Sequence, residues 1–460
     1  MKRIFILCLT AFLCLSAYAT PKYLIETGED GDATWSVSIA GATKVNLHDA
    51  SKTLNEWMNT TFTSNPSSTT DIWLAAGTYT LNGSITAGYS KIRLYGGFQG
   101  DETDKNTRRT IGGKAWNMQY PTIIDGANTY SIYAYSSPYF SGTWDGLTFR
   151  NGTTTGNGGV ARLYGGAKVL ACSFLNNTST GETGKGGALF TYQAGGIQVS
   201  DCYFEGNSAT QGGAIYINNN NKDQTYTIDH CYFKDNNATL TTNAGGAVYI
   251  QGAGTYTIAA SVLEHNNASG NGNGTAIFSN GTGDGVYTWI SNCLIKNQQN
   301  ADKYAVYILQ GAVLNCTFAR NAGGAVYMGG SSTGDYNGRI ENNIIWGDTE
   351  TECKISIRDN AAYTLKNNAL GRMITPASVD KADNTTLTKG NTSYFRRPSQ
   401  GDYHLCAGAA ELIAGKGRDL SSDEITTDLD GATRSTYDIG CYIYQIGPDG
   451  CSNCFYVCGE

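Results

Sequence analysis

The side chains that could carry acid–base chemistry are few in this sequence. The chain has 460 residues, with 39 Asp and Glu and only four His. An enzyme that cleaves polysaccharides needs clustered carboxylates, together with a basic residue or a bound calcium ion. Asp201 and His230 occupy one position in two neighbouring repeats, but Ala260 and Asn292 follow at that position. A single acid beside a single imidazole is more typical of a surface hydrogen bond than of a catalytic centre.

The other charged residues also fail to cluster. One repeat position alternates in sign, which predicts a ladder of ion pairs on a solvated face, made by Glu205, Lys234, Glu264 and Lys296. The sequence Asp428-x-Asp430-Gly resembles a capping turn more than a calcium loop. We therefore expect no catalytic residue, no metal site and no cofactor. The alternative is a polysaccharide lyase or glycoside hydrolase whose acids lie on loops outside the repeat, such as Asp223, Asp229 or Asp284.

These residues belong to a repeat that recurs about every 23 to 33 residues. Its first half reads Cys-x-Phe, with Ser261 once in place of the cysteines, which are Cys172, Cys202, Cys231, Cys293 and Cys316. Three residues after the Phe position, Gln298 appears once and asparagine in the other copies, at Asn177, Asn207, Asn236, Asn266 and Asn321. Its second half reads GGALF (186–190), GGAIY (212–216), GGAVY (245–249), GTAIF (274–278) and GGAVY (323–327).

The repeat predicts an all-β fold, a β-solenoid in which each unit forms one coil. The apolar residues alternate with period two, whereas helical repeats would space them by three and four residues. Equivalent residues would then stack on successive coils, about 4.8 Å apart. A stacked asparagine suits this design, because it tolerates left-handed backbone angles and its amide can bond the next coil.

The paired motifs Gly-Gly-Ala-Ile and Phe-x-x-Asn resemble the repeats of polymorphic outer-membrane proteins. More broadly, the chain is similar to right-handed parallel β-helices of the pectin-lyase-like type. Flanking stretches such as IWLAAGTYT (72–80), TIIDGAN (122–128) and NNIIWGD (342–348) agree with exported bacterial β-helix proteins. The resemblance covers roughly residues 45–445. It implies the architecture and brings no set of catalytic residues with it.

The predicted layout has four parts. Residues 1–19 form a signal peptide, because Lys2 and Arg3 precede a short apolar run and an Ala-Tyr-Ala cleavage site. Residues 20–70 form an N-terminal cap that includes an amphipathic helix at about 46–58. The β-helix coils occupy residues 71–370, and residues 371–460 form a Cys-containing C-terminal cap.

Two groups of cysteines have different predicted roles. The repeat cysteines share a face with Phe, so we expect them to be buried free thiols in the core. No His or carboxylate shares their inward positions, which argues against a metal site. In an exported chain, the tail is expected to form disulfides with the cysteines before it, among Cys406, Cys441, Cys451, Cys454 and Cys458.

An aromatic column provides the candidate binding surface. Period two turns the residue after the inward Ile or Val outward, which predicts a stacked stripe of Phe190, Tyr216, Tyr249, Phe278, Tyr307 and Tyr327. Flat aromatic rings suit the apolar faces of sugars, so the stripe could bind glycan. The alternative is that these rings only stabilise the contact between coils.

Composition narrows the function further. A net charge of −7 and a pI near 5.2, without a basic stripe, argue against nucleic acid as a partner. After the signal peptide, no apolar segment is long enough to span a membrane. We expect an exported, monomeric, non-enzymatic protein, secreted or at the outer surface, with the periplasm as the alternative. It would bind a glycan or a cell-surface partner, as an adhesin does. A purely structural spacer in the cell envelope is the further alternative.

Overall fold

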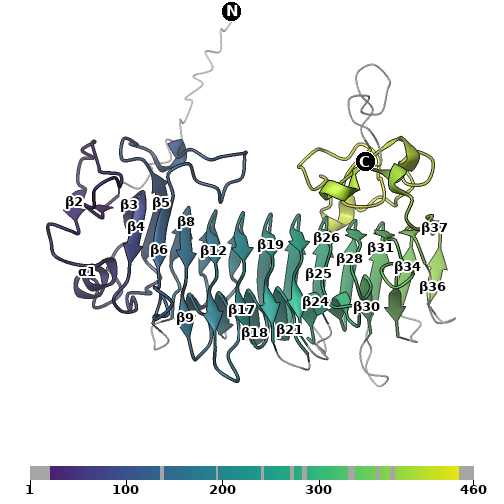
Figure 1. The fold of residues 1–460 in the computed structure, drawn as a ribbon, viewed down its shortest axis with the longest axis horizontal. Coiled ribbons are helices and arrows are strands. Elements are labelled where there is room, and N and C mark those ends of the chain that lie inside the picture. The colour runs from purple at the N-terminus through teal and green to yellow at the C-terminus, as the bar shows by residue number, and fades with distance from the viewer. Residues whose placement is uncertain are drawn as a thin grey trace, which may run out of the picture.

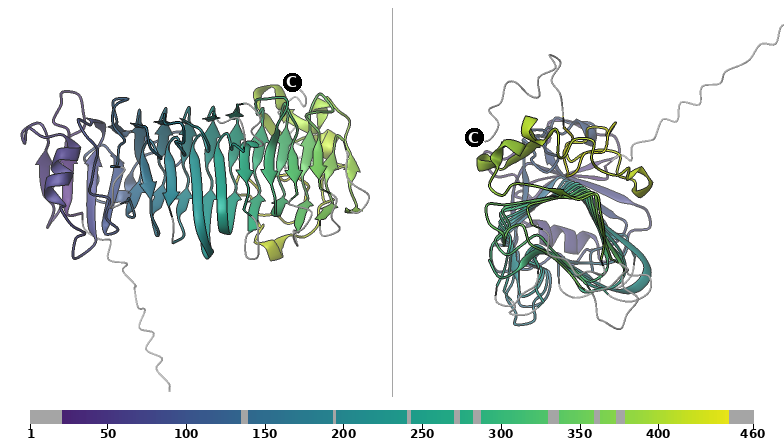
Figure 2. Two further views of the ribbon diagram at one scale, coloured as in Figure 1. Left: turned by 90° about the horizontal axis from the view of Figure 1, so that it is seen from below. Right: turned by 90° about the vertical axis from the view of Figure 1, so that its right-hand side faces the viewer.

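The computed structural model shows a right-handed parallel β-helix, as the repeat predicts. The coils stack in sequence order along an elongated body (Figure 1, Figure 2). The structure describes residues 21–134, 139–192, 195–239, 243–269, 274–281, 287–329, 337–358, 363–372 and 379–444. The predicted signal peptide, Asp284 and the tail cysteines Cys451, Cys454 and Cys458 lie outside the described residues.

Three parallel sheets run along the body. Among the described residues, the largest has 20 strands, which are β1 (Tyr23–Glu26), β2 (Thr43–Asn46), β3 (Thr70–Ala75), β5 (Ile92–Phe98), β7 (Thr143–Asp145), β10 (Ala161–Leu163), β11 (Lys168–Leu170), β14 (Leu189–Tyr192), β15 (Gln198–Ser200), β18 (Ile215–Asp229), β21 (Val248–Ala259), β24 (Gly274–Ser279), β25 (Tyr287–Ser291), β27 (Tyr304–Ile308), β28 (Gly311–Leu314), β30 (Val326–Met328), β31 (Gly338–Glu341), β33 (Ile355–Ile357), β34 (Tyr363–Lys366) and β36 (Asp380–Ala382).

The second and third sheets complete each coil. In the described chain, the second sheet has 12 strands, namely β4 (Gly77–Thr80), β6 (Thr122–Asp125), β8 (Leu147–Arg150), β12 (Ser173–Leu175), β16 (Tyr203–Glu205), β19 (Tyr232–Lys234), β22 (Val262–Glu264), β26 (Leu294–Lys296), β29 (Thr317–Ala319), β32 (Ile344–Trp346), β35 (Ala369–Leu370) and β37 (Thr385–Thr386). The third sheet joins β9 (Thr153–Thr154), β13 (Thr178–Ser179), β17 (Ser208–Ala209), β20 (Asn237–Ala238) and β23 (Asn267–Ala268).

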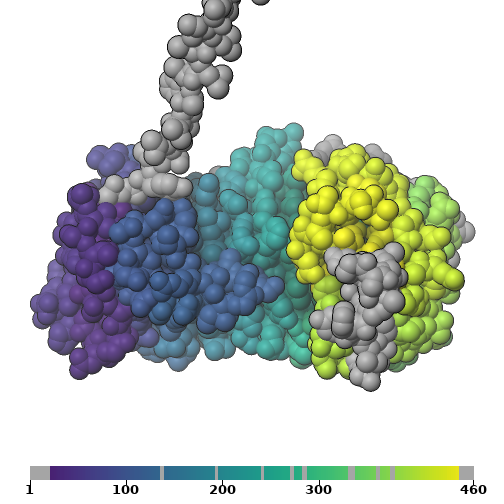
Figure 3. Space-filling view, turned by 90° about the horizontal axis from the view of Figure 1, so that it is seen from above, coloured from purple at the N-terminus to yellow at the C-terminus, as the bar shows by residue number. Residues whose placement is uncertain are grey.

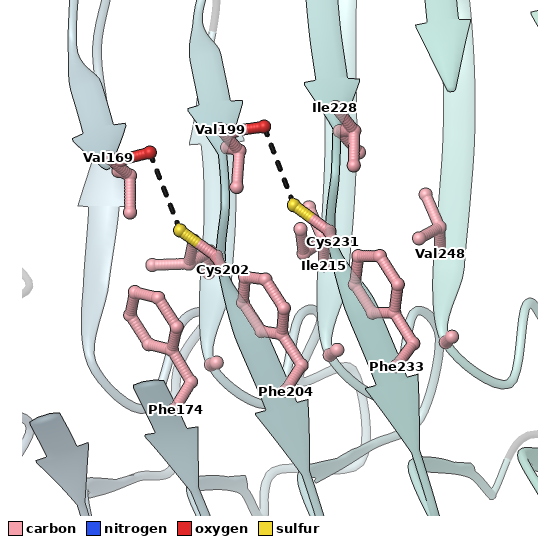
Figure 4. Packing of buried hydrophobic residues seen from close by; sticks show 14 of the residues in the cluster. Val169, Phe174, Val199, Cys202, Phe204, Ile215, Ile228, Cys231, Phe233 and Val248 are labelled. Atoms are coloured by element: carbon pink, nitrogen blue, oxygen red, sulfur yellow. Dashed lines mark hydrogen bonds between the residues drawn. The ribbon is translucent and has the colours of Figure 1, made fainter. Parts of the chain in front are cut away.

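Neighbouring coils pair in register, so equivalent side chains stack. Phe204 pairs with Phe233, and the rings of Phe174, Phe204 and Phe233 follow one another at centroid distances of 4.6 and 4.8 Å. This is the spacing of hydrogen-bonded strands. Figure 4 shows the Phe column inside the core, beside Cys202 and Cys231. The repeated sequence therefore produces a core that repeats itself along the body.

The repeat cysteines are buried and free, and they make hydrogen bonds. The backbone N of Cys172 donates to the Sγ of Cys202, 3.5 Å away on the next coil. The Cys202 thiol in turn lies within 3.1 Å of the carbonyl oxygen of Ser200. Ser261 takes the same role with its hydroxyl, and Asn343 takes it with Oδ1. The column thus needs a small side chain that accepts a hydrogen bond from the backbone of the preceding coil.

The asparagines form a buried ladder across the coils. Asn177 Nδ2 donates to the carbonyl oxygen of Phe149 (3.1 Å), and the backbone N of Asn177 donates to Asn207 Oδ1 (3.0 Å). The left-handed residue at each turn is the one before the ladder position, as at Asn176 and Asp235, with φ of 55° and 53°. The ladder position itself therefore supplies the hydrogen bonds, and its neighbour supplies the turn.

The N-terminal helix is α1 (Leu54–Thr61), which begins eight residues later than the predicted start at 46. Glu56 Oε2 accepts from the backbone N of Thr53 (2.8 Å), and this capping interaction fixes the helix start. Leu54, Trp57 and Met58 pack into the main core at the N-terminal end of the body (Figure 1).

The coils continue past the predicted end at 370, because β36 and β37 pair in parallel with β34 and β35. The following residues 391–444, here called the C-terminal segment, contain β38 (Phe395–Arg397), β39 (Asp402–Leu405) and short 3₁₀ turns. This segment folds back along the side of the body (yellow in Figure 1) rather than over the open end of the last coil. Phe395, Tyr403 and Ile439 pack there on Ile344 and Trp346 of β32.

A row of asparagines holds the C-terminal segment to the coils. These residues occupy the left-handed turn between the first and second sheets, where Asn292, Asn315 and Asn342 have φ of 51°, 51° and 58°. Asn342 bonds Arg418 twice, through Nδ2 to its carbonyl oxygen (2.7 Å) and through Oδ1 to its backbone N (2.8 Å). Asn292 Nδ2 donates to the carbonyl oxygen of Thr427 (2.6 Å). The same turn position is held in the earlier coils by other residues. We call the whole line of these turn residues the ridge, and its members are Ala171, Asp201, His230, Ala260, Asn292, Asn315 and Asn342.

The cysteines near the C-terminus divide into two states. Cys406 forms a disulfide, whereas Cys441 is a buried free thiol. Cys441 therefore does not take part in the predicted set of disulfides. Its backbone N bonds the hydroxyl of Thr317 (3.1 Å) on β29, and the side chain packs in the interface between segment and coils. Burial excludes water from the Cys441 thiol and raises its pKa to about 12, so it stays protonated.

Candidate functional site

The predicted aromatic stripe lies outside the main core, as period two requires, but most of it is covered. Phe190, Tyr216, Tyr249 and Phe278 are 0–3% exposed and form a cluster of their own. The Lys185 ammonium donates to the Tyr216 hydroxyl (3.1 Å) and lies 4.7 Å from its ring centroid. These four rings therefore have no open face for a ligand, contrary to the prediction. Tyr307 and Tyr327 are partly exposed and stack at 4.2 Å.

The open aromatic surface lies elsewhere, in a cleft on the ridge. An N-terminal loop, residues 99–121, covers the ridge over the first coils, and the C-terminal segment covers it over the last ones. Figure 3 shows this face, with the loop in blue, the segment in yellow and the middle coils in teal. The cleft has a volume of about 340 Å³, and its lining includes Trp116, Asp201, His230, Tyr232, Asp430 and Tyr442.

Three aromatic rings belong to this region of the cleft. Tyr203 and Tyr232 are paired residues of β16 and β19, half-buried, with ring centroids 5.6 Å apart. The Trp116 ring stacks on Tyr203 at 6.1 Å with an interplanar angle of 13°. Ser173 Oγ donates to the carbonyl oxygen of Trp116 (3.2 Å), which holds the loop to β12. Aromatic faces arranged in this way fit the C–H faces of sugar rings.

The loop that carries Trp116 is anchored by a charged pair at its base. Arg108 Nη2 donates to Asp145 Oδ1 (2.8 Å) at the end of β7, and Arg108 Nη1 donates to the carbonyl oxygen of Gly96 (3.0 Å). Both charged side chains are mostly buried. Charge-assisted bonds of this kind are shorter and stronger than neutral ones, so the position of the loop is defined by the coils.

Asp201 contributes a carboxylate with no partner in the described part of the chain. It lies on the ridge with φ of 55°, and none of the described side chains donates a hydrogen bond to it. Burial raises the pKa of Asp201 above its usual value, and the neighbouring carboxylate of Asp229 acts in the same direction, whereas His230 acts against them. Asp201 is thus an acceptor in the cleft whose hydrogen-bonding capacity is not used by any described side chain.

His230 is bonded to Asp229 rather than to Asp201, which corrects the pairing that the sequence suggests. His230 Nδ1 lies 3.0 Å from Asp229 Oδ2, and Asp229 Oδ1 accepts from the hydroxyl of Ser200. The hydrogen bond to Asp229 raises the pKa of His230. This arrangement orients the imidazole at the edge of the cleft. Asp223, another residue considered from the sequence, is exposed on β18, outside the cleft lining.

The opposite wall of the cleft is built around His404. Its Nδ1 lies 2.6 Å from Asp402 Oδ1 and its Nε2 lies 2.5 Å from Asp430 Oδ2, while the ring stacks on Tyr442 at 4.0 Å. Burial alone would lower the pKa of His404, but the bonds to Asp402 and Asp430 raise it to about 9. Asp428 accepts from the backbone N of Asp430 (3.0 Å) and organises the turn, as the sequence suggests.

The charge ladder flanks the cleft on the second sheet. Lys234 Nζ lies 2.9 Å from Glu205, and Lys296 Nζ lies 3.2 Å from Glu264. The alternating signs therefore pair between coils as predicted. Among the described residues, no three His, Cys, Asp or Glu side chains are grouped as metal ligands would be. The helices that the structure describes include none with the length and hydropathy of a membrane span.

Comparison with known proteins identifies the repeat. Residues 171–192 and 201–218 match the family described as the Chlamydia polymorphic membrane protein repeat. The chain thus carries, on a β-helix, repeats similar to those of polymorphic membrane proteins. It is 36% identical over 120 residues to "Probable outer membrane protein PmpA" of Chlamydia trachomatis, which covers 22% of this chain and 12% of that protein. It is 34% identical over 121 residues to "Probable autotransporter YfaL" of Escherichia coli, and this match covers 24% of this chain and 9% of that protein.

The matches therefore span about a tenth of the length of these relatives. A solved structure of the PL6 family alginate lyase AlyGC is similar over 89% of this chain and 59% of that chain. The sequence identity is 14% and the TM-score 0.39.

The sequence could have pointed to part of this site. The ring positions of Tyr203 and Tyr232 are visible in the motif Cys-Tyr-Phe, which recurs in neighbouring units. Trp116 and Asp430 lie on irregular segments, and nothing in the repeat indicates that these segments return to the same coils. His404 and Tyr442 were missed for the same reason.

Proposed function

We propose that the protein is an exported, surface-exposed β-helix protein that binds a glycan in the cleft on the ridge. The observation that carries the proposal is the half-buried group of Trp116 stacked on Tyr203 with Tyr232 tilted beside it, next to the Asp201 carboxylate, which has no donor among the described side chains. Rings supply flat apolar contact, and a carboxylate accepts hydrogen bonds from hydroxyl groups. Sites for small polar ligands combine these two features in a concave surface.

The comparisons support an exported location. The two relatives are named as an outer membrane protein and an autotransporter, and they are similar to this chain over 120 and 121 residues. The predicted signal peptide at 1–19 agrees with this location. In our proposal the protein is a monomer at the outer surface, and a glycan on a neighbouring cell or on the envelope is its ligand, as for an adhesin. Tyr307 and Tyr327, the partly exposed end of the aromatic stripe, would provide a second contact.

The test is a binding experiment with a panel of oligosaccharides. Wild-type protein is compared with Trp116→Ala and Tyr232→Ala, and Tyr164→Ala is the matched control because Tyr164 is 42% exposed outside the cleft. We expect the cleft variants to lose roughly tenfold in affinity and the control to retain it, since each ring supplies a substantial share of the contact.

Three outcomes would contradict the proposal. Binding that Trp116→Ala and Tyr232→Ala leave unchanged would place the ligand elsewhere. Absence of binding to the whole panel would favour a structural spacer. Release of reducing or unsaturated ends from the same oligosaccharides would favour an enzyme, and mass spectrometry of the incubated panel detects it.

A further inference from the structure

We propose that the cleft selects sugar residues that present hydrogen-bond donors and carry no anionic group. The ligand class is therefore a neutral or amino-bearing glycan, in contrast to polyuronates and sulfated glycans. This inference rests on the proposed function and adds the chemistry by which the same cleft would choose its ligand.

Among the described residues, the two imidazoles beside the cleft are already engaged by aspartates. His230 is bonded to Asp229 at 3.0 Å, and His404 lies between Asp402 and Asp430 at 2.6 and 2.5 Å. A carboxylate on a sugar could not use these imidazoles without displacing their aspartate partners. The exchange would replace one charge-assisted bond with another of the same kind, so it brings little gain in binding free energy.

Among the described residues that line the cleft, Lys114 is the other cation. Its side chain is exposed on the N-terminal loop, and its Nζ lies 5.7 Å from the centre of the Trp116 ring. It also lowers the pKa of Asp430, after the larger effect of His404, so its field reaches that carboxylate across the cleft. An exposed ammonium at a rim is strongly hydrated and screened by salt, and it therefore contributes little to selecting an anion.

The group of the cleft that has no donor among the described side chains is an acceptor, the Asp201 carboxylate. The Asp201 carboxylate has two oxygens and no donor among the described side chains, so it can accept from two hydroxyl groups or from an ammonium. An anionic sugar would face Asp201, with Asp229 and Asp145 also close enough to act on it. Like charges at this distance repel, and burial strengthens the repulsion. The aromatic faces add contact for neutral rings and for cations.

Asp201 can be replaced without changing the backbone conformation of its turn. The same left-handed turn position holds alanine in the preceding coil, at Ala171 (φ 51°), and in the second coil after Asp201, at Ala260 (φ 45°), and it holds asparagine at Asn292. Asp201→Ala and Asp201→Asn therefore reproduce turns that this fold already contains. A change in binding by either variant then reports on the carboxylate rather than on folding of the coil.

The experiment measures dissociation constants by calorimetry for four probes of matched length. These are a manno-oligosaccharide, a chito-oligosaccharide, a chitosan oligosaccharide and an oligogalacturonate. We expect the wild type to bind at least one of the first three, and to bind the oligogalacturonate at least about tenfold more weakly. Comparison of the neutral probes with the amino probe shows whether hydroxyl groups or an ammonium group supply the hydrogen-bond donors.

The variants then assign the selection to Asp201. We expect Asp201→Ala to lose about tenfold in affinity for the preferred probe, as is typical when a bond to a charged acceptor is removed. Asp201→Asn should reduce the discrimination against oligogalacturonate, because it removes the charge and keeps an acceptor. Asp223→Ala, an exposed acid outside the cleft lining, is the control and should change neither value.

The results separate this inference from the proposed function. Oligogalacturonate binding that is as tight as that of the neutral probes and sensitive to Trp116→Ala overturns the selectivity while the glycan cleft stands. Binding of a neutral probe that Asp201→Ala leaves unchanged overturns the role of Asp201. Failure of all four probes to bind overturns the proposed function and the inference together.

Discussion

Asn207 Nδ2 donates to Asn236 Oδ1 at 2.9 Å, and the backbone N of Asn207 donates to the same oxygen at 3.1 Å. Asn236 then repeats both bonds to Asn266 on the next coil. Each asparagine thereby satisfies backbone groups that the sheets leave unpaired at the turn. Because the amides are buried and consecutive, they polarise one another, and the ladder behaves as one network along the body.

Replacing Asn236 by alanine tests the ladder. The change removes the acceptor of the Asn207 backbone N and one of the two acceptors of Asn207 Nδ2, and it removes the Asn236 donor to the carbonyl oxygen of Phe204. Buried unsatisfied groups cost about 1–3 kcal/mol each, so we expect a loss of roughly 3 kcal/mol or more in the free energy of unfolding. Urea denaturation followed by circular dichroism measures it. Asn237→Ser is the matched control, since Ser208 holds that position in the preceding coil. Equal midpoints for the two variants would contradict the prediction.

The hydrogen bond accepted by the Cys202 thiol predicts which of two substitutions destabilises the protein more. Cys202 Sγ accepts from the backbone N of Cys172, and Ser261 shows that a hydroxyl can take this role in the same column. Valine fills the space but cannot accept the bond. We expect Cys202→Ser to cost less than about 1 kcal/mol and Cys202→Val about 1–3 kcal/mol in the free energy of unfolding. If valine proves the milder change, burial of the thiol rather than its hydrogen bond decides the residue type.

The sequence was sufficient for the fold because every coil repeats the same physical solution. Phe204, Asn207 and Ile215 recur at fixed spacing, and a strand period of two assigns each to a face without reference to distant residues. The same local logic explains why the Lys234–Glu205 pair could be predicted. Periodicity constrains only groups that belong to the repeat.

The candidate site could not be predicted in the same way, since its parts come from segments that do not repeat. Trp116 approaches Tyr203 from a loop anchored by Arg108, and Asp430 reaches the cleft only because the C-terminal segment folds back. The stripe was interpreted as open because period two gives the direction of Tyr216 but not what covers it. Lys185, which covers it, lies on the irregular turn before the Gly-Gly-Ala motif.

The pH dependence of stability should report on His404. Its pKa in the folded protein is about 9, compared with about 6.5 in an unfolded chain. The stabilisation by the protonated imidazole is therefore complete below pH 6.5 and lost as the pH rises through 9, and it is on the order of 3 kcal/mol. Asp402 and Asp430 stabilise the charged imidazole, and Arg396 Nη2 lies 3.3 Å from His404 Nδ1.

Thermal melting between pH 6 and 10 measures this contribution as the difference between the wild type and His404→Gln. The wild type should lose its advantage over this range, while the variant should follow a flatter curve. Parallel curves for the two proteins would show that protonation of His404 adds no stability, so that folding does not raise its pKa.

Arg434 should control how firmly the C-terminal segment is attached. Its buried guanidinium donates to the carbonyl oxygens of Thr427 (3.1 Å) and Gly440 (3.0 Å) and to Asn292 Oδ1 on the ridge (3.2 Å). Arg434→Met removes the donor to Asn292 Oδ1 and one of the donors to each of the carbonyl oxygens of Thr427 and Gly440, which costs roughly 3 kcal/mol at this site. Limited proteolysis should then cut within 391–444 several-fold faster. Arg109→Met, at an exposed arginine, is the control. Unchanged cleavage in Arg434→Met would show that apolar packing alone holds the segment.

Tyr216 and Tyr232 together decide which aromatic surface binds a ligand. Tyr216 is fully buried, with ring contacts to Phe190 at 5.4 Å and to Tyr249 at 4.7 Å, whereas Tyr232 is half-buried at the cleft. Tyr216→Ala removes a packed ring and should cost about 3–5 kcal/mol in the free energy of unfolding. Tyr232→Ala should lower glycan affinity with a smaller loss of stability. One variant should lose mainly stability and the other mainly affinity. Measuring the free energy of unfolding and the glycan affinity of both variants therefore distinguishes the two surfaces. A Tyr216→Ala protein with wild-type stability and no binding would return the ligand site to the stripe.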